Sequence, residues 1–125
     1  MFDWRRPHNL GVKDGRLAPC RRTPNCVSSQ ADPADAEHYI APLRGSIEDV
    51  RKAVESLPRT TIVSSTSNYL YAEFRSKLLG FVDDVEFFDD GAAIQVRSAS
   101  RLGRRDFHVN RKRIERLREL IRLKP

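Results

Sequence analysis

The segment YLYAEFRS, residues 69–76, alternates strictly between apolar and polar side chains. Leu70, Ala72 and Phe74 fall on one face of a β-strand, and the odd-numbered positions from 69 to 75 fall on the other. A half-buried strand has this period of two, so the segment predicts a strand whose apolar face packs against a core. The odd-numbered residues then form a polar face that points away from whatever covers the core.

Three more strands are predicted around this one. Residues 60–65 are rich in β-branched side chains, and Ser67 and Asn68 provide a turn into residues 69–76. A short connection leads to a strand at 81–88, and the Asp-Asp-Gly sequence at 89–91 is a hairpin signal before a last strand at 92–100. Short turns between successive strands indicate a four-stranded antiparallel meander.

Two helices flank the strands. Ser46 is a good N-cap for a helix that Pro58 ends, with Ile47, Val50, Val54 and Leu57 along one face. The second helix begins near Asp106 or Val109 and ends near Leu123. Its apolar residues cover an arc of about 120°, the width of a stripe that faces a core; they are Ile114, Leu117, Leu120 and Ile121.

These elements predict an α+β fold of two layers, in the order α-β-β-β-β-α. A four-stranded antiparallel sheet carries both helices on one face. Residues 1–45 contain five of the seven prolines and no sustained periodicity, which predicts an extended N-terminal arm with turns. The α+β domain then spans residues 46–125, and a chain of 125 residues is expected to form one core.

The positive charge is concentrated at the C-terminus. Residues 101–125 carry a net charge of +7 and residues 1–100 a net charge of −1. A basic helix can attract the phosphates of nucleic acid or of a lipid surface. Nucleic acid is not the favoured partner, because no aromatic residues are interleaved for base stacking and no glycine-rich loop is present.

The sequence has no apolar run of roughly 20 residues, and residues 1–10 lack the apolar core of a signal peptide. We therefore expect no transmembrane segment and a cytoplasmic location. Cys20 and Cys26 lie too far apart for a C-x-x-C motif, and no second Cys/His pair completes a zinc site. Free thiols are the favoured interpretation; a small disulfide loop, which needs an oxidising compartment, and a metal site are the alternatives. We expect no cofactor.

The polar face of the predicted sheet is unusually ionic. Three carboxylates, Glu73, Asp84 and Glu86, lie among Arg75 and Arg97, with Tyr71 beside them. A lattice of ion pairs or a partner interface is the favoured interpretation. The alternatives are a pocket for an anion or small ligand, a site for a hard divalent cation, and a glutamate acting as general acid or base. No nucleophile elbow, zinc-protease motif or phosphate-binding loop is present, so no catalytic residue is assigned.

Four sequence blocks and a fifth short one carry a resemblance to a known family. They are PNCVSSQ (24–30), YLYAEFRS (69–76), GFVDDVEF (80–87), IQVRSASR (94–101) and NRKRI (110–114). In this order, over residues 19–120, they resemble domain-of-unknown-function family 1499, which occurs in bacteria and in plant and algal plastids. The resemblance implies no established reaction, cofactor or ligand. It directs attention to the polar residues within the blocks, Asp83 included.

The blocks also indicate a second candidate pocket, where the last strand meets the last helix. Asn110, Arg111 and Arg113 at the start of that helix are expected to meet Ser98 and Ser100, near backbone donors that attract an anion.

The leading hypothesis is a non-enzymatic module that binds an anionic small molecule or a protein partner. Its candidate ligand-binding residues are Tyr71, Glu73, Arg75, Asp84, Glu86, Arg97, Ser98, Ser100, Asn110, Arg111 and Arg113. One alternative is a metal-dependent or acid/base hydrolase that uses Glu73, Asp84 and Glu86, and whether the protein is an enzyme stays open at this stage. The other alternative is non-specific binding of nucleic acid by the C-terminal helix.

Overall fold

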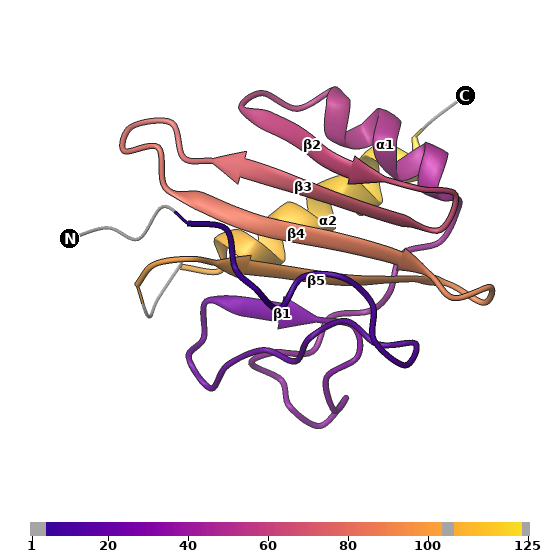
Figure 1. The fold of residues 1–125 in the computed structure, drawn as a ribbon, viewed down its shortest axis with the longest axis horizontal. Helices are drawn as coiled ribbons and strands as arrows, with labels where there is room; N and C mark the ends of the chain where they lie inside the picture. The colour runs from indigo at the N-terminus through magenta and orange to yellow at the C-terminus, as the bar shows by residue number, and fades with distance from the viewer. Residues whose placement is uncertain (1–4, 104–106, 124–125) are drawn as a thin grey trace.

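A meander of four antiparallel strands forms the centre of the computed structural model, which describes residues 5–103 and 107–123 (Figure 1). The strands are β2 (Thr60–Ser65), β3 (Tyr69–Arg75), β4 (Val82–Asp89) and β5 (Ile94–Ser100). Helix α1 (Ile47–Glu55) precedes them and helix α2 (Val109–Arg122) follows. The α+β class and the two helices agree with the sequence-based prediction, whereas the predicted order α-β-β-β-β-α omits a strand that precedes α1.

The predicted number of strands is wrong by one. The N-terminal arm contributes β1 (Cys26–Ser28), which pairs antiparallel with β5 and places Val27 opposite Ser98. The sheet therefore has five strands in the order β1-β5-β4-β3-β2. Three residues are too few to show alternation, and the backbone hydrogen bonds of an edge strand do not depend on side-chain pattern.

Both helices cover the same face of the sheet, as predicted. Leu70, Ala72 and Phe74 of β3 belong to one buried cluster with residues of β4 and β5, and α1 and α2 cover this cluster, with α2 behind the sheet in Figure 1. The helical members are Ile47, Val50, Ala53, Val54, Ile114, Leu117 and Ile121. Val27, Ile40 and Leu43 from the first 45 residues pack into the same cluster.

The residues just before each helix set how it begins. The Ser46 hydroxyl accepts a hydrogen bond from the Asp49 amide, and the Asp49 carboxylate accepts one from the Ser46 amide, which is a capping box. Helix α2 begins after His108, whose backbone is left-handed and whose side chain does not cap the helix.

Among the described residues, no helix combines the length and the hydropathy that crossing a bilayer requires.

The N-terminal arm covers the other face of the sheet. In Figure 1 it passes in front of β4 and β5, on the side opposite α2. The Arg6 guanidinium donates to Glu73, the Gly11 amide donates to Glu86, and the Pro19 carbonyl accepts from Arg97. The polar face that the alternation predicts is therefore enclosed between the sheet and the arm.

Candidate functional site

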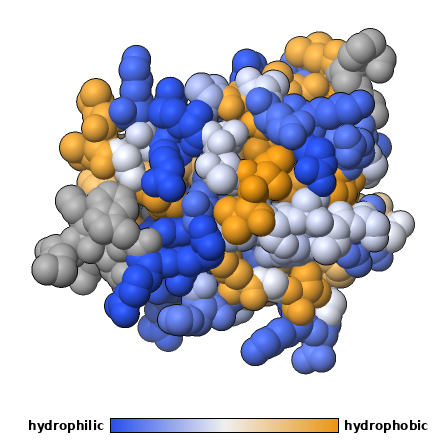
Figure 2. Space-filling model, turned by 45° about the horizontal axis from the view of Figure 1, so that its top comes forward, coloured by the Kyte–Doolittle hydropathy of each residue, from blue (hydrophilic) through white to orange (hydrophobic). Residues whose placement is uncertain are grey.

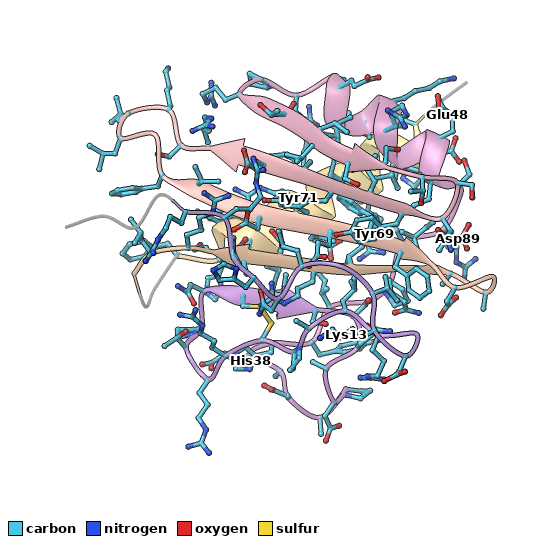
Figure 3. All side chains as sticks on the ribbon, viewed as in Figure 1. Lys13, His38, Glu48, Tyr69, Tyr71 and Asp89 are labelled. Carbon is cyan, nitrogen blue, oxygen red and sulfur yellow. A yellow bond between two sulfur atoms is a disulfide. The ribbon has the colours of Figure 1, made fainter. Side chains whose placement is uncertain are left out.

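The polar face carries the charged residues in the arrangement that the sequence predicts. The strand register sets Glu73 opposite Asp84, and Glu86 opposite both Tyr71 on β3 and Arg97 on β5. All five side chains are buried, because the arm excludes solvent from them. Figure 3 shows the tyrosine side chains of β3 on the side of the sheet where the arm runs.

Arg101, immediately after β5, links the carboxylates of this face. Its Nε lies 2.8 Å from Asp84 Oδ2, and one terminal nitrogen lies 2.7 Å from Glu73 Oε2. Arg6 reaches the same oxygen of Glu73 at 2.9 Å, and the Tyr71 hydroxyl donates to Asp84. Alternation along the strand assigns no direction to Arg101, the last residue of the IQVRSASR block, because the strand pattern ends at Ser100.

Their surroundings shift the pKa values of Glu73 and Glu86 in opposite directions. Burial by itself would raise the pKa of Glu73, but the hydrogen bonds from Arg6 and Arg101 outweigh burial and lower it. Burial raises the pKa of Glu86, and the hydrogen bonds from Tyr69 and the Gly11 amide offset only part of that effect. Glu86 Oε1 has no hydrogen-bond partner among the described residues.

Arg97 is a buried cation with few partners. One terminal nitrogen donates to the Pro19 carbonyl at 3.3 Å, and its Nε has no hydrogen-bond partner among the described residues. No carboxylate of the described chain lies within 4 Å of its nitrogens. Burial lowers the pKa of Arg97, and the charges of Glu86 and Asp84 counteract this only from a distance.

Arg97 also lines a cavity of about 390 Å³ between the arm and the end of β5. We call it the arginine cavity, because the described residues that line it include five arginines and one carboxylate: Arg5, Arg6, Arg21, Arg97 and Arg101 against Asp84. Asn25 and Ser100 add neutral polar groups to the wall. This arrangement can receive an anion of several oxygen atoms.

Most residues of the second candidate pocket are hydrogen-bonded to one another. The Ser98 hydroxyl donates to Asn110 Oδ1 at 2.6 Å, and Asn110 Nδ2 donates to Ser100 Oγ at 2.9 Å. Arg113 donates to Ser98 and Asn110 and forms an ion pair of 2.7 Å with Asp83. The structure thus brings these residues together as a buried junction between β5 and α2, whereas Arg111 turns to the carbonyls of Ala36 and Glu37.

The carboxylates are not arranged as a cation site. Among the described residues, no group of three histidine, cysteine or acidic side chains could hold a metal ion. Glu73 and Asp84 accept hydrogen bonds from Arg101, and Glu86 accepts them from Tyr69 and Gly11.

The cysteines form a disulfide, Cys20–Cys26, so the favoured interpretation of free thiols is wrong. The turn through Thr23 and Pro24 brings their Cα atoms to 5.7 Å, a separation that the sequence spacing alone could not establish. His38 supports this segment, because its ring nitrogens lie 2.8 Å from Asp35 Oδ2 and 2.9 Å from the Thr23 carbonyl.

The arginines of α2 are largely engaged within the protein. Arg118 binds Glu115 and the carbonyls of Ala41 and Pro42, and Arg122 binds Glu119. The interpretation of this helix as a solvated face with internal pairs accounts for these contacts better than a polyanion site does.

The chain belongs to the family described as Protein of unknown function (DUF1499), whose model matches residues 16–121. No curated protein and no solved structure matches the chain. Arg21, Arg97 and Arg101 of the arginine cavity lie within the matched region, whereas Arg5 and Arg6 precede it.

Proposed function

We propose that this protein is a non-enzymatic binding module for an oxyanion, and that the anion binds in the arginine cavity. One observation carries the proposal: the Arg97 side chain is 5% exposed, lines the cavity, and has an Nε without a partner among the described residues. A buried guanidinium with unsatisfied donors is unfavourable unless an acceptor completes it.

An entering anion would supply further acceptors to the Arg97 guanidinium, which lines the cavity. A guanidinium presents a planar set of donors that matches the oxygens of a carboxylate or phosphate. Arg21 and Arg5 are exposed at the cavity wall, where they can attract the anion. Ser100 accepts its hydrogen bond from Asn110, which leaves the proton of its own hydroxyl to donate.

The other candidate residues have supporting roles in this proposal. Glu73 and Asp84 hold Arg101 at the cavity, and Glu86 with Tyr69 holds the arm at Gly11. Ser98, Asn110 and Arg113 fix the end of β5 to α2. A binding role is favoured over the hydrolase alternative, because the carboxylates that a hydrolase would use accept hydrogen bonds from the protein itself.

The test measures binding of inorganic phosphate, sulfate and citrate by calorimetry and thermal shift. Wild-type protein is expected to bind at least one of them and to melt at a higher temperature in its presence. Arg97→Met is expected to weaken that binding by about tenfold or more, which corresponds to the loss of one charge-assisted hydrogen bond. The matched control is Arg75→Met, which removes a half-exposed arginine of the same sheet face outside the cavity wall.

Arg21→Met provides a second variant in case Arg97→Met does not fold, because Arg21 is exposed. It is expected to weaken anion binding without changing the urea midpoint. Absence of binding by the wild type to all three anions would overturn the proposal, as would wild-type affinity in both cavity variants.

The cytoplasmic location expected from the sequence stays a prediction, and the Cys20–Cys26 bond weighs against it. Disulfides persist in oxidising compartments and are rare where thiols are kept reduced. Alkylation of the protein in its native cells, before and after reduction, would show which state the cysteines occupy.

A further inference from the structure

The turn between β3 and β4 exposes two leucines that the fold does not use. Leu78 is 90% exposed and Leu79 is 66% exposed, next to the exposed Lys77. Hydrogen bonds between Ser76 and Phe81 close the turn without help from the leucine side chains. Two adjacent large apolar side chains in water indicate a contact surface.

A third apolar side chain protrudes from the same end of the sheet. Phe107 is 81% exposed, and its φ of 51° is followed by a φ of 65° at His108. Left-handed backbone is unfavourable for residues that carry a Cβ, and here it holds an aromatic ring in solvent. Arg75 pairs with Val82 and Asp83 with Ser100, so the 76–81 turn and the chain after β5 leave the sheet at one end.

Among the described residues, the exposed charge at this end is positive. Arg5, Arg6, Arg75 and Lys77 are exposed there, whereas the nearby described carboxylates, Glu73, Asp83 and Asp84, are buried against Arg101 and Arg113. The arginine cavity opens beside them, since Arg5, Arg6 and Gly103 form part of its wall. Figure 2 shows hydrophobic surface next to strongly hydrophilic surface at the left end of the molecule, where the 76–81 turn lies in Figure 1.

We propose that this end of the sheet docks on an anionic phospholipid bilayer. Leu78, Leu79 and Phe107 enter the boundary between headgroups and acyl chains, and the surrounding cations face the lipid phosphates. Apolar insertion and charge attraction are the two contributions that hold a peripheral protein on a membrane. The docking itself does not depend on the proposed function. Only the binding of a lipid phosphate in the arginine cavity rests on it.

The test is co-sedimentation with phosphatidylcholine vesicles prepared with and without phosphatidylglycerol. Wild-type protein is expected to bind the phosphatidylglycerol vesicles, to bind pure phosphatidylcholine about tenfold or more weakly, and to dissociate as salt is raised. The double variant Leu78→Ser/Leu79→Ser is expected to bind the anionic vesicles about tenfold or more weakly than wild type. Its urea midpoint and its affinity for inorganic phosphate stay unchanged, because both leucines are exposed and outside the cavity.

Leu123→Ser is the matched control, because Leu123 is 61% exposed at the C-terminal end of α2, away from the turn. It is expected to bind vesicles like the wild type. Equal vesicle binding by the wild type and the Leu78→Ser/Leu79→Ser variant overturns the docking surface, as does a wild type that binds no vesicle. Binding of phosphate, sulfate or citrate without vesicle binding overturns docking alone, and vesicle binding without binding of any of these three anions overturns the proposed function alone.

Discussion

On one face of the sheet, helices α1 and α2 bury Leu70, Val85 and Phe87 in an apolar cluster, which borders one polar junction between β5 and α2. On the opposite face, the N-terminal arm buries Glu73 and Glu86 beneath residues that touch them through hydrogen bonds and ion pairs. Both faces exclude water. Their covers differ in kind: regular helices lie on the first face, and extended chain fastened by a disulfide lies on the second.

The difference indicates which face can open. Apolar burial stabilises a contact in proportion to its area, so the helices are held over their whole length. Buried ion pairs gain little over their own desolvation, so the part of the arm over the ionic face depends on a few specific contacts and on the Cys20–Cys26 disulfide, whereas Val27, Ile40 and Leu43 further along pack into the apolar core. The arginine cavity lies under the arm, where a ligand can enter by breaking the fewest contacts.

The largest expected effect lies on the helical face. Leu117→Ala and Phe74→Ala should each lower the free energy of unfolding by about 2–5 kcal/mol, because each leaves a cavity in the packed core. Urea denaturation measures this directly. Midpoints within error of the wild type would mean that the core is not where the alternation of residues 69–76 places it.

A smaller effect is expected from releasing the arm. The double variant Cys20→Ser/Cys26→Ser removes a short covalent loop and should cost about 2 kcal/mol. The urea midpoint should fall while the far-ultraviolet circular dichroism of the native state stays unchanged, because α1 and α2 lie on the other face. Loss of the helical signal before the urea transition would contradict the separation of the two faces.

The smallest expected effect is a loss of stability that depends on pH on the ionic face but not on the helical face. The folded-state pKa of Glu73 is lowered, so its stabilising contribution is present above the unfolded value near 4.5 and is lost as pH falls through the folded pKa. At neutral pH, Glu73→Gln should be less stable than wild type by about 1 kcal/mol. Below the folded pKa that difference should vanish, whereas the deficit of Leu117→Ala should persist at both pH values. A Glu73→Gln deficit that does not change with pH would show that Glu73 acts through packing instead of charge.

The strands of the meander and their orientation could be predicted because apolar and polar residues alternate along a half-buried strand, one kind on each face. Leu70 and Glu73 are on the faces that this rule assigns them. Strand β1 could not be found this way, because it is held by backbone hydrogen bonds and has only three residues. The role of Arg101 was missed for a related reason: it lies just beyond the strand, where periodicity no longer assigns a direction.

The sequence by itself determined that a sheet of this chain has one apolar and one ionic face, because side-chain direction along a strand is a local property. Only the tertiary structure decided what covers the ionic face, which cysteine state results, and which arginine is left with an unsatisfied donor. Those outcomes depend on contacts between residues up to 78 positions apart, as between Pro19 and Arg97. No local pattern encodes such contacts, since they form only when the whole chain has packed.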